Sequence, residues 1–228
     1  MRTRPGRAST DAVDITQQTI GILGGTGPQG RGLAYRLARA GQPVVIGSRT
    51  LERAQDTAAQ VGLGLTGHSN VEAARHSDIV IVTVPWEGHA VTLKVVRKEL
   101  EGKLVIDSVN PLGFDSKGAY ALRPEEGSAA EQAAVLLPET RVTAAFHHLS
   151  ATVLTDPEIE TIETDVLVLG ENRTDTDIVQ GLIDRVPGLR GIYAGRLRNA
   201  HQVEALVANL ISINRRYKRH AGVRITDL

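Results

Sequence analysis

The sequence predicts an α/β protein with a doubly wound parallel sheet and a small α/β domain at its C-terminal end. Short apolar runs rich in β-branched residues alternate with stretches of helical spacing between residues 19 and 107. One run, 78–84, has an uninterrupted apolar core, as strands do when both faces of a parallel sheet are covered. A Gly-x-Gly-x-x-Gly turn joins the first run to the first helical stretch, which is the arrangement of a Rossmann fold.

The first half of the chain supplies the elements of this sheet in a regular order. Strands alternate with helices, so we expect right-handed crossovers between parallel strands. Gly41 ends the first helix, and Ser69 or Asn70 is expected to cap a short third helix. The expected strands are 19–23, 43–47, 78–84 and 104–107, the expected helices are about 28–40, 51–61, 70–75 and 87–100, and a glycine-rich turn is expected at 62–67.

The second half is expected to complete the sheet and then to form a smaller unit. A long loop with an Asn-Pro pair is expected at 108–124. Helices are then expected at about 125–137, 175–185 and 199–219, and strands at 141–146, 166–169 and 191–193. The predicted organisation is a disordered extension at 1–17, a Rossmann domain at 18–146 and a small C-terminal domain at 147–228.

The composition excludes several classes of function. Lysine and arginine number 26, as do aspartate and glutamate, so the net charge of zero argues against a partner that is a nucleic acid or a membrane surface. The chain has no cysteine, which removes disulfides, thiolate metal sites and cysteine nucleophiles. No apolar run could span a membrane and no signal sequence is recognisable, so we expect a cytoplasmic protein. The arginines of the extension (Arg2, Arg4, Arg7) could contact a phosphorylated ligand or simply be solvated.

The glycine turn predicts a dinucleotide site. Gly25 would make the tight turn, Gly27 would let a pyrophosphate approach the backbone, and Gly30 would let helix and strand pack closely. The helix that follows presents unpaired N–H groups and a partial positive charge to phosphates. The alternative is a glycine turn with a purely structural role.

The end of the second expected strand favours NADP over NAD. NAD-binding folds place a carboxylate there for the ribose 2′-hydroxyl. This chain has Gly-Ser-Arg at 47–49, and Arg53 lies one helical turn beyond Arg49. Ser48 and the two arginines could therefore bind a 2′-phosphate. The alternative is that both arginines form surface ion pairs with Glu52 or Asp56.

Other candidate residues follow the later strands, because ligands of such sheets lie beyond the carboxyl ends of the strands. Trp86, the only tryptophan, could form a wall for a nicotinamide ring or belong to the core. Asn110 is a further candidate. His147 is a weak candidate for a catalytic base or hydrogen-bond donor, with a structural role as the alternative. His147 and His148 are adjacent and cannot chelate one metal together, so no metal site is expected.

Six short motifs, taken together, are characteristic of one family. They are 24–27 (Gly-Gly-Thr-Gly) with Gly30 and Gly32, 47–49 (Gly-Ser-Arg), 84–87 (Val-Pro-Trp-Glu), 127–131 (Gly-Ser-Ala-Ala-Glu), 144–148 (Ala-Ala-Phe-His-His) and 222–225 (Gly-Val-Arg-Ile). From residue 19 onward the chain resembles the NADPH-dependent reductases of coenzyme F420, an 8-hydroxy-5-deazaflavin. The resemblance implies reversible hydride transfer between NADP(H) and F420, by direct passage from nicotinamide C4 to deazaflavin C5. It also implies that the C-terminal domain closes the deazaflavin cleft.

The resemblance also implies which residues contact the cofactors. Those at the phosphates are Thr26, Gly27, Pro28 and Gln29; those at the 2′-phosphate are Ser48, Arg49 and Arg53; those lining the cleft are Val84, Trp86, Ala151 and Ala221. Arg53 stands where the family commonly has lysine and keeps the charge. The His-Leu-Ser segment at 148–150 departs from the apolar, proline-containing segment usual in the family.

Two other functions remain open at this point. One is an NADP-dependent imine or keto-acid reductase of the same superfamily, although such enzymes generally carry a larger helical C-terminal domain with a Lys or Asp acid. The other is a non-catalytic protein that senses NADP through binding. The expected partners are small-molecule cofactors only. The broad apolar face of the last helix, with Val203, Leu206 and Leu210, predicts a homo-oligomer, most simply a homodimer.

Overall fold

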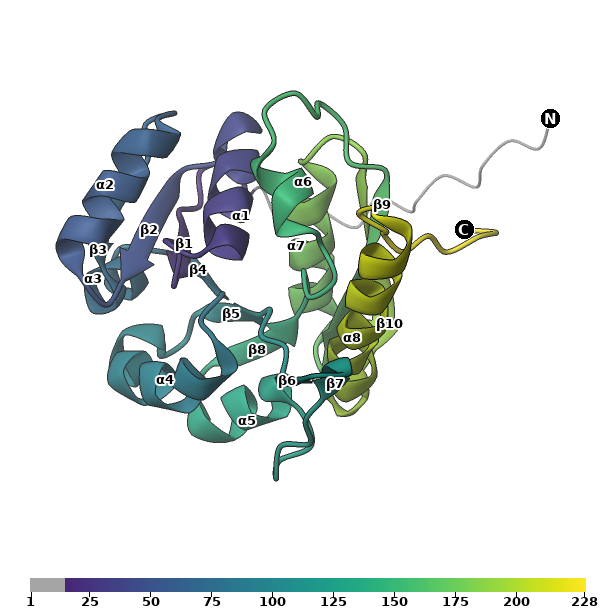
Figure 1. Ribbon diagram of the computed structural model, residues 1–228. Coiled ribbons are helices and arrows are strands. Elements are labelled where there is room, and N and C mark those ends of the chain that lie inside the picture. The colour runs from purple at the N-terminus through teal and green to yellow at the C-terminus, as the bar shows by residue number, and fades with distance from the viewer. Residues whose placement is uncertain (1–14) are drawn as a thin grey trace.

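The computed structural model describes residues 15–228, in which eight strands form one sheet with helices on both faces (Figure 1). The strand order is β10-β9-β8-β5-β4-β1-β2-β3. The strands are β1 (Ile20–Leu23), β2 (Val44–Ser48), β3 (Thr66–Ser69), β4 (Ile79–Val82), β5 (Leu104–Asp107), β8 (Arg141–Ala144), β9 (Thr164–Gly170) and β10 (Leu189–Gly195). The helices are α1 (Pro28–Arg39), α2 (Leu51–Val61), α3 (Asn70–Arg75), α4 (Trp86–Leu100), α5 (Ala129–Leu136), α6 (Ala151–Thr155), α7 (Arg173–Asp184) and α8 (Ala200–Tyr217). None of these helices is long and apolar enough to cross a membrane.

The sheet separates two layers of core, because successive side chains of a strand point to opposite faces. In β4, Ile79 and Ile81 pack with residues of α1, α2 and α7, whereas Val80 and Val82 pack with residues of α3, α4 and α5. Figure 1 shows α1 and α2 on one side of the strands and α4 and α5 on the other. The uninterrupted apolar core of this strand therefore has the predicted cause, burial on both faces.

The parallel arrangement predicted for the first half is confirmed. β1 pairs in parallel with both β2 and β4, and β5 pairs in parallel with β4 and β8. β9 then joins the same sheet antiparallel to β8, with Ala144 opposite Leu169. The C-terminal strands thus extend the first sheet, and the division of the chain at residue 146 stays a prediction.

Two local predictions are only partly right, and one short helix lies where the sequence predicts no element. The expected turn at 62–67 contains the start of β3, which pairs with β2 at the edge of the sheet. The expected loop at 108–124 contains an antiparallel hairpin, β6 (Leu112–Asp115) and β7 (Gly118–Ala121). Asp115 Oδ1 accepts hydrogen bonds from the backbone N–H groups of Lys117 and Gly118, which closes the turn of that hairpin. The short helix α6 was not expected either.

The predicted N-terminal extension is only partly described. Residues 1–14, including the three arginines, lie outside the described residues. Ile15, near the end of the predicted extension, is instead buried in the core beside α7. The Gln42 side chain donates to the backbone oxygen of Ile15 at 2.8 Å, so residues of the predicted extension already pack on the fold before Gln18.

Candidate functional site

A cavity of about 920 Å³ opens at the carboxyl ends of β1, β2, β4 and β5, where doubly wound sheets bind their ligands. This volume is near the upper end of the range for small-molecule sites. Twelve of the residues predicted to bind cofactors line it: Thr26, Gly27, Pro28, Gln29, Ser48, Arg49, Arg53, Val84, Trp86, Asn110, His147 and Ala151. The structure therefore brings together residues that lie up to 125 positions apart in the sequence.

The glycine turn forms one end of this cavity. Gly25 and Gly30 do not line the cavity but shape the turn beneath it. A Cβ atom on Gly30 would lie 2.7 Å from the Cα atom of Gly25, so only glycine allows the two segments to approach this closely. Gly24, which has φ +74°, donates its N–H to Asn70 Oδ1 at 3.3 Å. Helix α1 begins directly after Gly27 with no side-chain cap, which leaves its first backbone N–H groups available to an anion.

Two arginines stand at the β2 end of the cavity. Arg49 and Arg53 are both exposed, and neither forms an ion pair with Glu52 or Asp56, nor with any other residue of 15–228. The alternative prediction, that Arg49 and Arg53 form surface ion pairs with Glu52 or Asp56, is therefore wrong. Ser48 is buried beside them, and its Oγ accepts the backbone N–H of Thr50 at 3.3 Å.

The segment after β8 forms the middle of the cavity wall and is held by two of the predicted residues. Gln29 Nε2 donates to the backbone oxygen of Phe146 at 3.1 Å, and Asn110 Nδ2 donates to the backbone oxygen of His147 at 3.0 Å. These amides connect the glycine turn and the segment after β5 to the segment that follows β8. Phe146 has φ +69°, a conformation that non-glycine residues rarely adopt.

His147 is a buried imidazole with neither ring nitrogen bonded to a partner within residues 15–228. Burial lowers its pKa to about 4, and burial likewise lowers the pKa of His148 to about 4. Both rings are therefore neutral at pH 7. Leaving a buried nitrogen unpaired costs free energy, so the unpaired nitrogens of His147 are a place where a ligand could add a hydrogen bond.

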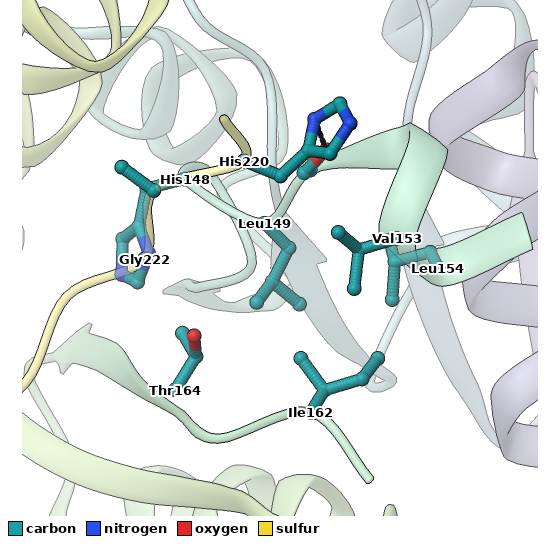
Figure 2. Close-up of a pocket in the computed structure, with 10 residues that line it drawn as sticks. His148, Leu149, Val153, Leu154, Ile162, Thr164, His220 and Gly222 are labelled. Carbon is teal, nitrogen blue, oxygen red and sulfur yellow. Dashed lines mark hydrogen bonds between the residues drawn. The ribbon is translucent and has the colours of Figure 1, made fainter. Parts of the chain in front are cut away.

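Ala221 lies apart from the other predicted residues. It lines a separate cavity of about 20 Å³ between the segment 148–154 and the C-terminal segment. Figure 2 shows the side chains of Leu149, Val153 and Ile162 converging on this cavity, which has room for about one water molecule. The backbone N–H of Ala221 donates to Asn214 Oδ1 at 2.7 Å, and Asn214 in turn lines the large cavity.

A further part of the cavity wall consists of residues that the sequence does not single out, although the resemblance implies that the C-terminal part of the chain closes the cleft. Helix α8 contributes Val207, Leu210, Ile211 and Asn214, and the β6–β7 hairpin contributes Leu112 and Phe114. The sequence predicts the apolar face of α8 as a surface for packing and association. Part of that face instead lines the cavity. Residues 15–228 contain no group of three His, Cys, Asp or Glu side chains that could hold a metal.

Comparisons with known proteins agree with this geometry. A sequence model of the family described as "NADP oxidoreductase coenzyme F420-dependent" matches residues 19–111. An F420-dependent NADP reductase of Methanothermobacter thermautotrophicus is 37% identical over an alignment of 228 positions, which covers 95% of this chain and 98% of the relative.

Solved structures show the same fold. A crystal structure from Arthrobacter sp. FB24, provisionally described as an F420-dependent NADP reductase, superposes with a TM-score of 0.79 at 22% identity and covers 92% of this chain and 99% of that one. An imine reductase of Bacillus cereus BAG3X2 superposes with a TM-score of 0.60 at 18% identity; the match covers 89% of this chain but 62% of the imine reductase.

Proposed function

Because this chain belongs to the family of F420-dependent NADP reductases, we propose that it catalyses reversible hydride transfer between NADP(H) and coenzyme F420. The observation that carries the proposal is the 37% identity to such a reductase across 95% of the chain. The cavity supports it independently, since residues of a dinucleotide turn and apolar residues of α8 line the same cavity. A cavity of about 920 Å³ with these two kinds of lining suits two ligands bound side by side.

The glycine turn and the two exposed arginines are proposed to bind NADP. The uncapped first turn of α1 would receive the pyrophosphate, with Thr26 and Gln29 beside it. Arg49 and Arg53 would bind the 2′-phosphate as charge-assisted donors. Their freedom from ion pairs within the described residues supports this role, because no carboxylate has to be displaced first.

The middle of the cavity is proposed to hold the two reacting rings. When bound, the cofactors supply the chemistry: a hydride passes between nicotinamide C4 and deazaflavin C5, and one proton accompanies reduction of the deazaflavin. The protein then has to hold the rings at about 3–3.5 Å and to keep water out. Val84, Trp86 and Ala151 would form the surfaces around them.

His147 is proposed to serve as a hydrogen-bonding residue of this site, not as a strong acid. Its ring is neutral at pH 7 because burial lowers its pKa to about 4. A neutral imidazole offers one N–H donor and one acceptor, and both nitrogens lack a partner among the described residues.

The alternative of an imine or keto-acid reductase has less support. The match to an imine reductase leaves 38% of that protein without a counterpart here, since it covers 62% of its length. Lys218 is the only lysine after residue 146, and it lies exposed beyond the end of α8 and does not line the cavity.

The proposal is tested by mixing purified protein with NADPH and oxidised F420. We expect the visible absorbance of the deazaflavin to disappear in step with NADPH oxidation. FMN serves as a control acceptor and should not be reduced at a comparable rate. Tight NADPH binding without reduction of F420 would contradict the proposed function and favour an NADP-sensing protein.

We further propose that the protein works in the cytoplasm as a homodimer, with small-molecule cofactors and no nucleic acid as its partners. The dimer is supported by the apolar residues that α8 leaves at the surface, Ile213 and Tyr217, which are 40% and 68% exposed. Light scattering over a range of concentrations tests it, and a monomer at every concentration would contradict it.

A further inference from the structure

A buried polar cluster lies directly behind the cavity wall that contains Trp86. His89 of α4 and Asp107 at the end of β5 are both fully buried, and Glu204 of α8 is 3% exposed. None of the three lines the cavity. Their burial has a cost in desolvation, so their hydrogen bonds should show what they do.

The hydrogen bonds of His89 assign its protons. Nε2 lies 2.7 Å from Asp107 Oδ2, and Nδ1 lies 2.9 Å from Gln132 Oε1. The amide of Gln132 cannot be turned over, because its Nε2 donates to the carboxylate of Glu126 at 3.1 Å. Both His89 nitrogens therefore face oxygen acceptors, and only the doubly protonated imidazolium donates to both.

This ring connects two segments of the cavity wall. The rings of His89 and Trp86 stack at 5.7 Å between centroids with 28° between their planes, one helical turn apart on α4. Asp107, the acceptor of His89, also accepts the backbone N–H of Val109 at 3.0 Å through its other oxygen. Ser108, Val109 and Asn110 line the cavity on that side.

We propose that His89 is held as an imidazolium and is a positioning residue, which fixes the Trp86 ring and the segment 108–110 in the wall of the cavity. The charge is neutralised by Asp107 on one side, while the imidazolium stacks on the indole at 5.7 Å between ring centroids, a separation at which a cation is attracted by the ring electrons. Loss of the proton would break the bond to either Asp107 or Gln132 and loosen the wall.

The charges around His89 are consistent with this state. Asp107 on β5 favours the cation, as does the hydrogen bond to Gln132 on α5, and they raise the pKa of His89 above its ordinary value in spite of burial. Glu204 on α8 keeps its proton up to about pH 8, because burial raises its pKa, and it adds its negative charge only above that pH. Glu126, before α5, acts through Gln132, and His147 faces Asp107 from the segment after β8. The imidazolium should therefore persist above the ordinary titration of histidine and be lost as the pH rises further.

The test uses the emission of Trp86, the only tryptophan of the chain. An imidazolium in contact with an indole quenches its fluorescence, whereas a neutral imidazole quenches it weakly. At pH 7 the wild type should show a loss of emission relative to His89→Gln, and this difference should disappear as the pH is raised. His201→Gln, which changes an exposed histidine of α8, should behave as the wild type. Equal emission of the wild type and His89→Gln at pH 7 would overturn the proposal.

Two further measurements keep the proposal open to refutation if His89→Gln folds poorly. Nitrogen NMR of the wild type should show one histidine with both ring nitrogens protonated at pH 7.5, and a neutral tautomer at every histidine would overturn the proposal. In a folded His89→Gln protein, kcat should fall about tenfold with little change in the KM for NADPH, because the reacting rings are misplaced but the phosphates are not. The emission and NMR tests need no hydride acceptor, so their outcome is separate from that of the proposed function.

Discussion

Replacing Gly30 by alanine tests the geometry of the glycine turn. The added methyl carbon would lie 2.5 Å from Thr83 Oγ1, 2.7 Å from the Cα atom of Gly25 and 3.0 Å from the backbone oxygen of Gly24. Thr83 cannot rotate away freely, because its hydroxyl donates to the backbone oxygen of Leu23 at 2.8 Å. The turn itself has to open, by roughly 0.7 Å if the 2.7 Å contact is to reach an ordinary 3.4 Å.

This displacement should lower both stability and affinity. Overpacking of this kind costs about 1–3 kcal/mol of unfolding free energy. The backbone N–H groups of the turn would also be misplaced relative to the pyrophosphate. Losing one hydrogen bond to a charged group corresponds to a loss of about 10- to 100-fold in NADPH affinity.

The assay is a pair of measurements on Gly30→Ala and a matched control, Gly181→Ala. Gly181 lies inside α7 with its nearest neighbour, Ile15 Cδ1, 4.0 Å from an added Cβ, so alanine should fit there and stabilise the helix by about 0.5–1 kcal/mol. Denaturant unfolding gives the stabilities and fluorescence titration gives the NADPH dissociation constants. Unchanged NADPH affinity in Gly30→Ala would refute the role that we assign to this turn.

The remaining predictions concern the arginines and the buried carboxyl group. Arg49→Ala should weaken NADPH binding about 10- to 100-fold and leave NADH binding unchanged. The control, Arg173→Ala on α7, should change neither affinity. Equal losses of affinity for the two cofactors would contradict the 2′-phosphate assignment. Burial raises the pKa of Glu204 to about 8, so the folded protein holds the proton of this carboxyl group more tightly than the unfolded chain does. The group therefore lowers the free energy of unfolding progressively as the pH rises from about 4.5 to about 8. Glu204→Gln cannot ionise, so melting temperatures at pH 5 and pH 8 should show the variant gaining relative to the wild type at the higher pH; a constant difference would contradict the raised pKa.

Much of the central sheet could be predicted because its signals are local. Each of β1, β2, β4 and β5 is a short, mostly apolar run that adjoins a helix in the sequence, and such runs depend little on distant parts of the chain. The glycine turn and the Ser48-Arg49 pair can likewise be predicted from the sequence, since their functions depend on residue types at fixed spacing. These residues all lie where the sheet ends, as predicted.

The elements that were missed depend on distant partners. β3 is a polar edge strand, Thr-Gly-His-Ser, whose only sheet neighbour is β2, so nothing in its own composition marks it as a strand. The C-terminal strands are predicted as strands, but the pairing of β9 with β8, which continues the first sheet, is not, because pairing joins residues far apart in the sequence.

The residues of α8 that line the cavity could not be predicted for the same reason. An apolar helix face indicates burial without indicating what covers it. The cluster of His89 and Asp107 was also invisible, because 18 positions separate the two residues and a lone histidine carries no signal in sequence.

The most direct test of the proposed chemistry follows the hydride itself. NADPH is labelled with deuterium at nicotinamide C4, separately on each face of the ring, and used to reduce F420. Direct transfer predicts that one of the two labelled forms delivers its deuterium to C5 of the reduced deazaflavin, which mass spectrometry detects. Reduced F420 without deuterium from either form, or no reduction at all, would contradict direct transfer between the two cofactors.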